Sequence, residues 1–450
     1  MRNNNIVSQW LGDLSRIKQV KNSMKRVIVV GGGAAGLMSA YAAAQNGNDV
    51  LLIEKNEKLG KKIYITGKGR CNFTNDVPVD EFLQNVVRGE KFLRGTLYGF
   101  SPQKTIEFFE SYGLSVKTER GNRVFPASDH ARDVTKTLDR ACKESGVAIH
   151  LAEKVVKLHT TMPDIIHMSD IVDSTTPNII PMPRIVSVET DKATYECDCV
   201  IVATGGLSYP STGSTGDGYL FARQAGHAVV DTKVALCGIN LQGEFFKSLQ
   251  GLALKNVAIS AKYDGKIVYS AFGEMLFTHF GVSGPLVLSL SSLINRLPIT
   301  SLEIFVDLKP VLDESTLDKR LLRDFEKYKN KQIANALIEL LPSKLIPIVL
   351  NFSGIPKEKN VNSVTKEERA ALSRVLKNMP MRAKSLRGYE EAIVTSGGVD
   401  LKEINPKTME SKKISGLKFC GEVLDIDAFT GGFNMQIAFS TGFAAGNSIR

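Results

Sequence analysis

Residues that build disulfides and metal sites are scarce in this chain of 450 residues, which has six cysteines and six histidines. The cysteines stand at positions 71, 142, 197, 199, 237 and 420. Their scatter through a long chain argues against the disulfide framework of small secreted domains. Cys197 and Cys199 have no second Cys or His pair at zinc-ligand spacing. We therefore predict that both pack within a strand and that the chain has no metal site.

Long apolar runs are also missing. No run approaches the roughly 18 residues that span a bilayer, and residues 1–23 have no apolar core of the kind found in secretory signals. We therefore expect an N-terminal extension over residues 1–23, no membrane span and a cytoplasmic protein. The hydrophobic share of 43% and the charged share of 23% are ordinary for a globular chain, which excludes disorder as the main state.

Acidic residues are fewer than basic ones, 47 against 57, so the net charge is +10. The surplus is concentrated, because residues 312–389 hold 16 Lys and Arg but only 9 Asp and Glu. A local basic surplus is compatible with a solvated helical face. It is equally compatible with a surface that binds RNA phosphates, so RNA stays open as a partner through 312–389.

What the chain does have is a strand, a glycine-rich turn, a helix and a second strand near its start. Residues 26–30 are β-branched and apolar, residues 37–45 are Ala-rich, and residues 49–53 are again apolar. Between them, Gly31-x-Gly33-x-x-Gly36 is the dinucleotide-binding fingerprint in its required context. The glycines allow a tight turn, a close approach of the backbone to a pyrophosphate, and helix–strand packing.

Glu54 ends the second strand, where its carboxylate can accept hydrogen bonds from ribose hydroxyls. An acid there disfavours the 2′-phosphate of NADP, which leaves FAD or NAD. Only one fingerprint is present, and a second glycine-rich turn, Thr430-Gly-Gly-Phe-Asn434, precedes the final helix. We therefore predict FAD, with Asn434, Met435 and Gln436 at the flavin edge, where a helix N-terminus stabilises negative charge.

The segment Gly69-Arg-Cys-Asn-Phe-Thr-Asn75 resembles the Gly-Arg-Cys-Asn-x-Thr-Asn motif of a family of bacterial flavoproteins. Three further stretches agree: Ala203-Thr-Gly-Gly206 with Thr215-Gly-Asp-Gly218, residues 277–285, and residues 419–425 with Gly431-Gly-Phe-Asn434. The resemblance runs from about residue 25 to the end. It implies a Rossmann-like FAD domain of the two-dinucleotide-binding type with an inserted domain. Its known members include an enzyme that reduces 3-oxo-Δ4,6 bile acids and one that forms dihydrouridine in ribosomal RNA.

The fingerprint, the glycine turns and the resemblance together indicate the cofactor contacts. Lys62, Gly69 and Arg70 belong to a basic, glycine-rich stretch suited to the pyrophosphate or the flavin edge. We expect FAD to contact Gly31, Gly33, Ala35, Gly36, Glu54, Lys55, Lys62, Gly69, Arg70, Cys71, Asn72, Val155, Thr204, Gly205, Gly206, Gly421, Glu422, Gly432, Asn434, Met435 and Gln436.

Two residues are catalytic candidates. His279, between two phenylalanines, either packs or donates a proton to the substrate. Cys71 either packs or contacts the flavin, since a redox role needs a resolving partner and none is near in sequence. Asp217, which precedes an expected helix at 219–225, is interpreted as its N-cap.

The fold class is α/β, with the FAD domain interrupted by a β domain that carries a helical subdomain. We expect the first segment of the FAD domain over 24–231, the inserted β domain over 232–311, helices over 312–378, and a return through the insert to the FAD domain over 379–450. Four prolines at 163, 177, 181 and 183 predict a surface insertion.

Flavin chemistry narrows the function to hydride transfer. One hypothesis is a reductase of C=C bonds conjugated to a carbonyl, acting on a steroid-like bile acid intermediate with NAD(P)H as electron donor. The alternative is a flavin-dependent ribosomal RNA dihydrouridine synthase. An apolar, sterol-sized pocket between the FAD domain and the insert favours the first, and a basic open groove favours the second.

Overall fold

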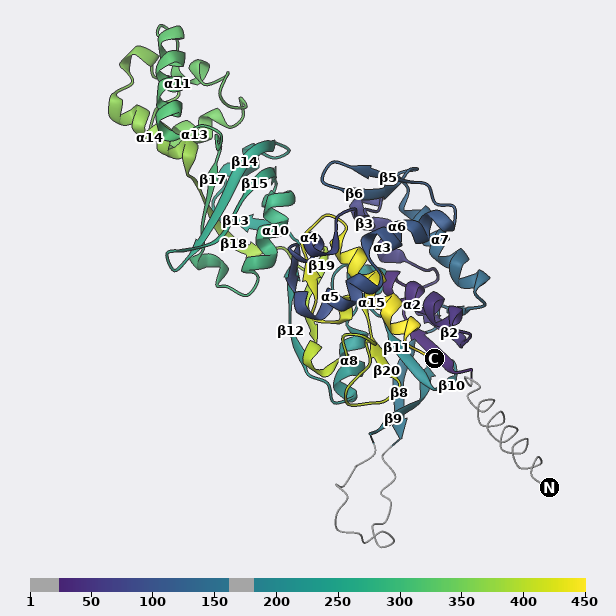
Figure 1. The fold of residues 1–450 in the computed structure, drawn as a ribbon. Helices are drawn as coiled ribbons and strands as arrows, with labels where there is room; N and C mark the ends of the chain where they lie inside the picture. Colours follow the sequence, from purple (N-terminus) through teal and green to yellow (C-terminus); the bar gives the residue numbers. More distant parts are fainter. Residues whose placement is uncertain (1–23, 162–181) are drawn as a thin grey trace, which may run out of the picture.

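The structure, a computed structural model, describes residues 24–161 and 182–450. The expected extension over 1–23 and most of the proline-rich segment 163–183 lie outside the described residues. The described chain forms three parts in a row: an α/β domain, a β-barrel and a helical subdomain at the far end of the barrel (Figure 1).

A five-stranded parallel sheet forms the centre of the α/β domain, with strand order β20-β11-β1-β2-β7. Its strands are β1 (Arg26–Val30), β2 (Asp49–Glu54), β7 (Ala148–Leu151), β11 (Cys199–Val202) and β20 (Leu417–Phe419). The β-branched, apolar runs of the central strands are buried, as parallel sheets with covered faces require. Because β20 comes from the last tenth of the chain, the C-terminal segment completes the domain that the N-terminal segment begins.

Two helices of this domain pack tightly against each other: α2 (Ala34–Gln45) and α15 (Phe433–Asn447). They approach so closely that a Cβ on Gly442 or Gly446 would lie 2.4 or 2.2 Å from a backbone oxygen of α2. Glycines at these two positions therefore allow the contact. Both helix N-termini line the same cavity, described below.

The rest of the α/β domain surrounds this centre. Its other helices are α3 (Lys61–Ile65), α4 (Val79–Leu83), α5 (Glu90–Gly99), α6 (Pro102–Ser111), α7 (Ala131–Glu144) and α8 (Asp217–Gln224). Its small antiparallel sheets are β3 (Thr74–Asn75) with β6 (Arg123–Pro126) and β5 (Val116–Glu119); β8 (Val155–Thr161) with β9 (Arg184–Thr190) and β10 (Thr194–Glu196); and β4 (Val86–Arg88) with β21 (Asp427–Ala428). Gly216, and not Asp217, caps α8, because Asp217 is the first helical residue and its carboxylate binds a lysine. The N-cap prediction for Asp217 was therefore wrong.

The inserted β domain is a closed six-stranded barrel, with strand order β13-β16-β15-β14-β17-β18. The strands are β13 (Ile239–Leu241), β14 (Ala253–Tyr263), β15 (Lys266–Thr278), β16 (Gly281–Ser283), β17 (Glu303–Asp307) and β18 (Met379–Leu386). Helix α10 (Pro285–Ile294) follows β16 and packs on β15. The connection to the α/β domain is the antiparallel pair β12 (Val229–Ala235) and β19 (Val394–Val399). The predicted fold class is confirmed, and closure of the sheet leaves the barrel no open strand edge.

The helical subdomain interrupts the barrel between β17 and β18. It contains α11 (Glu314–Lys327), α12 (Ile333–Ala336), α13 (Ile346–Phe352) and α14 (Lys366–Lys377). Its buried leucines and isoleucines are continuous with the barrel core, whereas the α/β domain has a separate core. A small separate cluster contains Ala235, Leu236 and Val394, at the connection between the two domains. The insert therefore packs as one unit, joined to the α/β domain through β12 and β19.

Candidate active site

A cavity of about 1230 Å³ opens between the α/β domain and the barrel. On the α/β side its wall comes from the loops that follow β1, β2 and β11, from the segment 60–75, and from the start of α15. On the barrel side its wall comes from β15, β16, the start of α10, and the segment before β19. The carboxyl ends of the parallel strands thus face the barrel across the cavity, which is the position where such sheets bind ligands.

The glycine fingerprint forms the turn between β1 and α2. Gly31 has φ +106° and donates its N–H to the Ile53 oxygen. A Cβ on Gly36 would lie 1.8 Å from the Gly31 oxygen, so this glycine allows the turn to close on the helix. A Cβ on Gly33 would meet no protein atom within 4 Å, because Gly33 faces the cavity. The turn therefore combines a tightly packed glycine with one that leaves space for a ligand.

Glu54 lines the cavity at the end of β2. Its carboxylate accepts hydrogen bonds from the Gly32 N–H (2.6 Å) and from the Asn56 N–H (2.8 Å) and side-chain amide (2.6 Å). These donors orient the carboxylate beside the fingerprint, where a ribose would lie. Asn56, which no sequence motif indicated, is thus part of the same site.

The predicted cations are paired with carboxylates. Lys62 Nζ lies 2.6 Å from Glu422 Oε2, and Lys55 Nζ lies 2.7 Å from Asp217 Oδ2. Arg70 pairs with Glu119 and lowers the pKa of that carboxyl. Each pair joins two segments that are distant in sequence, which periodicity cannot reveal. These cations therefore hold the walls of the cavity together in addition to facing it.

The start of α15 lines the cavity through its backbone, while two of its polar side chains bind within the protein. Asn434 accepts from the Ala428 N–H and donates to the Ala428 oxygen (2.7 Å). Gln436 is buried, where it accepts from Thr74 and donates to the Phe100 oxygen. These contacts fix the helix N-terminus in place, so its backbone amides and its dipole face the cavity.

Most of the predicted cofactor contacts line this cavity. They are Gly31, Gly33, Ala35, Glu54, Lys55, Lys62, Arg70, Asn72, Val155, Thr204, Gly205, Glu422, Gly432, Asn434 and Met435. The predicted residues that lie outside the lining are Gly36, Gly69, Cys71, Gly206, Gly421, Gln436 and His279. Most of the second group are glycines, and Gly36, Gly206 and Gly421 face neighbouring protein atoms.

Neither catalytic candidate is among the residues that line the cavity. Cys71 is fully buried, and burial raises the pKa of its thiol to about 12, so the thiolate that redox chemistry requires does not form at neutral pH. His279 is exposed to solvent and contacts Phe280 edge-on, with 5.1 Å between the ring centroids. Phe280 lines the cavity, and His279 lies near Glu391 of the lining, where it helps to lower the pKa of that carboxyl after Arg387.

The residues of the barrel wall were not predicted individually. Its side chains are mostly apolar: Leu236, Leu276, Phe280, Pro285, Leu288, Ile393 and Val394. Glu274 and Glu391 also belong to it, whereas Lys and Arg are absent from the barrel side of the lining as far as the chain is described. Alternation along a strand indicates which residues share a face, but not which other domain that face meets.

The residues of the α/β wall fit FAD. Two buried polar atoms of this wall, Asn72 Oδ1 and Thr204 Oγ1, have no hydrogen-bond partner among the described residues. Buried polar atoms are normally paired, so both are suited to a bound ligand. With the space at Gly33 and the acid at Glu54, they support FAD, as the sequence predicts. Within 24–161 and 182–450, no cluster of His, Cys, Asp or Glu could hold a metal ion, and no helix is long and apolar enough to cross a membrane.

Comparisons with known proteins agree with this cofactor. Residues 25–448 match the family model described as the HI0933-like protein Rossmann domain. The chain is 30% identical to a 3-dehydro-bile acid Δ(4,6)-reductase of Clostridium scindens over 94% of this chain and 99% of that protein. It is also 31% and 29% identical to the ribosomal RNA dihydrouridine synthases of Haemophilus influenzae and Escherichia coli, over 94% of this chain and 98% and 97% of those proteins. The chain therefore belongs to the HI0933-like family of Rossmann-fold flavoproteins.

Proposed function

We propose that this protein is an FAD-dependent reductase of C=C bonds conjugated to a carbonyl, and that its substrate is a steroid-like 3-oxo-Δ4,6 bile acid intermediate. The observation that carries the proposal is the apolar barrel wall, which faces the cofactor residues and, among the described residues, has no lysine or arginine of its own. A flat hydrocarbon skeleton gains free energy by burying its surface against such side chains. A polyanion such as RNA would find no cation on the barrel wall and would be repelled by its two carboxylates, Glu274 and Glu391.

The names of the relatives describe the same type of reaction, the reduction of a C=C bond, on two different substrates. A Δ(4,6)-reductase acts on C=C bonds, and the formation of dihydrouridine saturates a C=C bond conjugated to a carbonyl. When bound and reduced, FAD supplies a hydride from N5 for such a bond. The chain's own residues hold the cofactor along the α/β wall, orient the substrate against the barrel wall, and keep water from the space between them. We propose NAD(P)H as the reductant, bound transiently at the same cavity.

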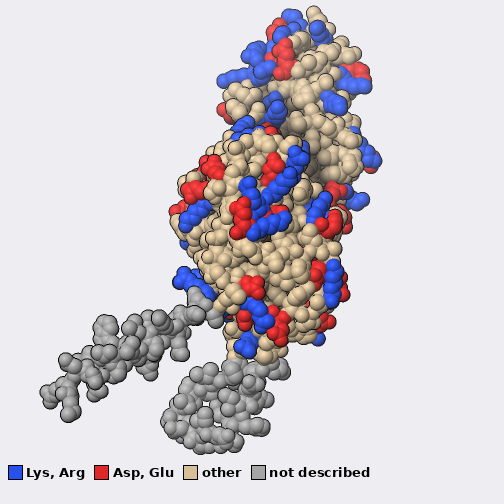
Figure 2. Space-filling model, turned by 90° about the vertical axis from the view of Figure 1, so that its right-hand side faces the viewer, with Lys and Arg blue, Asp and Glu red and all other residues tan. Residues whose placement is uncertain are grey.

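A second candidate function is the reduction of uridine in ribosomal RNA. Of the 16 cations in 312–389, seven form no ion pair with any described residue: Lys319, Lys331, Lys344, Lys366, Arg374, Arg382 and Lys384. Such cations can bind phosphates. Against this candidate, five of them belong to the helical subdomain, which the barrel separates from the cavity (Figure 1). Lys and Arg are also interspersed with Asp and Glu on the face shown in Figure 2.

The experiment is an anaerobic half-reaction. The flavin of the purified protein is reduced and then mixed with a 3-oxo-4,6-diene steroid acid, while flavin absorbance and product mass are followed. We expect reoxidation of the flavin and a product heavier by two hydrogens for each bond reduced. A flavin that stays reduced with this substrate, but is reoxidised by unmodified ribosomal RNA, would replace the first function with the second.

A further inference from the structure

Reduction of a conjugated C=C bond requires a proton as well as a hydride, and the cavity must supply a donor. His279 and Cys71 lie outside its lining. Along the described lining there is no histidine, and Tyr209 is the one tyrosine. Ser283 also lines the cavity, but an aliphatic hydroxyl releases a proton much less readily than a phenol does. The lysines of the lining all belong to the α/β wall, and burial raises the pKa of the Cys420 thiol to about 12. Tyr209 lies close to Glu391 of the barrel wall and is therefore the donor nearest the proposed substrate side.

The backbone at Tyr209 is held in an unusual conformation. Its φ of +52° is left-handed, which is a costly conformation for a bulky residue and is found mainly where surrounding structure enforces it. Tyr209 donates its N–H to the Tyr389 oxygen (2.8 Å), and Pro210 follows directly. Thr212 returns two hydrogen bonds to the Tyr209 oxygen. The contacts of the loop thus hold a strained conformation at a residue that lines the cavity.

The residue before it anchors the loop. Ser208 is fully buried; its hydroxyl accepts a hydrogen bond from Lys62 and donates one to Glu422 (2.7 Å). Its N–H donates to the Thr395 hydroxyl at 3.1 Å. These contacts tie the Tyr209 loop to the α/β wall and to β19 at once. Tyr209 is therefore fixed where the cofactor wall meets the barrel wall.

The hydroxyl of Tyr209 has no hydrogen-bond partner among the described residues. The hydroxyls of Tyr98, Tyr195 and Tyr269 each have one. Burial raises the pKa of Tyr209, and the nearby Glu391 carboxylate raises it further. Arg387 binds Glu391 and keeps that carboxyl ionised by lowering its pKa. Tyr209 therefore carries its proton at neutral pH, and its hydroxyl is available to a ligand.

We propose that Tyr209 is a catalytic residue that donates the proton in the reduction, an inference that rests on the proposed function. Hydride adds to the electron-poor end of the conjugated C=C system, and the displaced electron pair moves toward the carbonyl to form an enolate. The phenol O–H bond then breaks, its proton goes to the enolate, and the phenolate regains a proton from solvent. The substrate is reduced by two electrons and the flavin is oxidised by two.

The test compares Tyr209→Phe with wild type in the two oxidative half-reactions of the reduced flavin. Removing the hydroxyl breaks no hydrogen bond with a described residue, so FAD content and melting temperature should match wild type. Reoxidation by the 3-oxo-4,6-diene steroid acid should slow by about 10²- to 10⁴-fold, while reoxidation by O₂, which needs no donor at this position, should stay within about twofold. Tyr263→Phe, at the end of β14 and outside the cavity lining, also removes a hydroxyl without a hydrogen bond to any described residue; it is the matched control and should leave both rates unchanged.

The possible outcomes distinguish a failure of the proposed reductase function from a failure of the role proposed for Tyr209. A wild-type flavin that the steroid does not reoxidise overturns the proposed function and this role with it. A wild-type flavin that is reoxidised, with Tyr209→Phe equally fast, overturns the role of Tyr209 alone. Equal slowing of the steroid and O₂ reactions would also overturn it, because that result indicates altered flavin placement and not a lost proton.

Discussion

The two walls of the cavity differ in the charged side chains that they contain. The α/β wall contains many ionised side chains, and Lys55, Lys62 and Arg70 each have a carboxylate partner. The barrel wall contains apolar side chains and two carboxylates, with no cation among the described residues. Lys68, Arg123 and Lys154 of the α/β wall form no ion pair with any described residue. A wall that combines paired and unpaired cations suits a cofactor with phosphates and ribose hydroxyls, whereas an apolar wall suits a hydrocarbon substrate. The difference favours cofactor binding by one domain and substrate binding by the other.

The largest effect is expected for a substitution in the glycine turn between β1 and α2, which forms part of the α/β wall. Gly36→Ala places a Cβ 1.8 Å from the Gly31 oxygen, and we expect it to destabilise the fold by about 3 kcal/mol or more. Gly33→Ala places its Cβ in open space, so the apoprotein should be as stable as wild type while FAD affinity falls. Urea unfolding of the apoproteins and FAD titration measure both effects. Equal destabilisation of the two apoproteins would contradict the assignment of Gly33 to ligand space.

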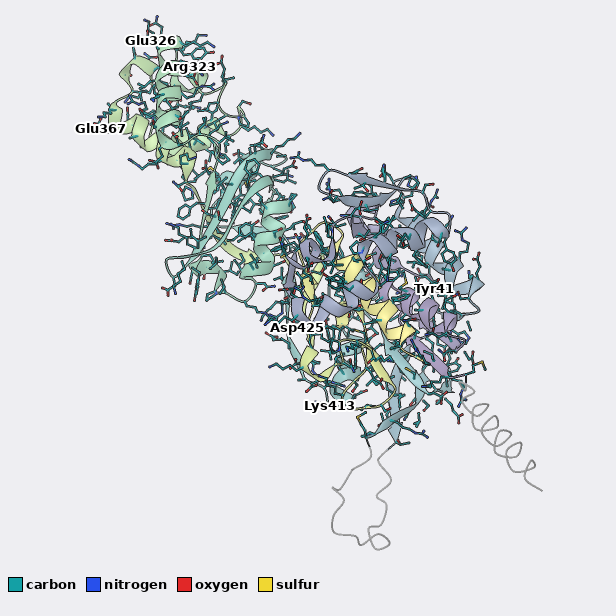
Figure 3. All side chains as sticks on the ribbon, in the orientation of Figure 1. Tyr41, Arg323, Glu326, Glu367, Lys413 and Asp425 are labelled. Atoms are coloured by element: carbon teal, nitrogen blue, oxygen red, sulfur yellow. The ribbon has the colours of Figure 1, made fainter. Side chains whose placement is uncertain are left out.

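A second prediction concerns Asp427, a buried carboxyl of the α/β domain that forms no ion pair with any described residue. Asp427 is fully buried beside Arg88, which already binds Asp425, one of the residues labelled in Figure 3. Burial raises the pKa of Asp427 from 3.8 to about 6, with Ser396 and Arg88 opposing the shift. Because the folded state then binds the proton more tightly than the unfolded state, stability falls as pH rises from about 4 to about 6, and the loss persists above that range.

Asp427→Asn removes this titration. We expect it to raise the free energy of unfolding at pH 8 relative to wild type by at most about 3 kcal/mol, and to give little or no gain below pH 4. Unfolding curves at both pH values check the sign. A variant that is less stable than wild type at pH 8 would show that the Asp427 carboxylate is favourably paired.

The third prediction concerns a substitution in the barrel wall. Phe280→Ala removes an aromatic side chain on which the Arg387 guanidinium stacks, 4.5 Å from the ring centroid. We expect the steroid KM to rise by at least about tenfold, consistent with about 1.5 to 3 kcal/mol of lost burial, with FAD content unchanged. Phe272→Ala, in the strand that precedes Phe280 but 57% exposed, is the control. Loss of FAD in Phe280→Ala would mean that the walls do not divide their roles in this way.

The smallest expected effect concerns the helical subdomain. Lys319 and Lys344 are exposed and form no ion pair within the described chain. Replacing both by Glu should change kcat/KM for the steroid by less than about twofold, because screened charges act over roughly 10 Å. The same double variant reduces RNA affinity if RNA is the substrate. A filter-binding titration with ribosomal RNA at two salt concentrations distinguishes these results.

Local sequence signals predicted the cofactor half of the molecule well. The fingerprint predicted β1, α2 and β2 within a few residues, since strand, turn and helix preferences are encoded by neighbouring side chains. The return of the C-terminal segment was also predicted, from its glycine turn. The pairing of Lys62 with Glu422 joins residues 360 positions apart, and no local pattern records such a partner.

The substrate half was less accessible to sequence reasoning. The motif at 277–285 favours His279 as a candidate, but this residue, directly after strand β15, lies outside the cavity lining, and the next residue, Phe280, lies inside it. His279 and Phe280 form the turn between β15 and β16, where strand alternation no longer indicates which side chain faces the cavity. No sequence pattern indicates Tyr209, because its left-handed backbone and its surroundings depend on contacts with Ser208, Tyr389 and Glu391 that form only on folding.

The most direct test of the division between the two walls is a side-by-side measurement of flavin reoxidation. Equal samples of the reduced protein are mixed under anaerobic conditions with the 3-oxo-4,6-diene steroid acid or with ribosomal RNA that lacks dihydrouridine. An apolar substrate wall predicts fast reoxidation by the steroid that is insensitive to salt, and slow or no reoxidation by RNA. Fast, salt-sensitive reoxidation by RNA together with no reaction with the steroid would contradict it.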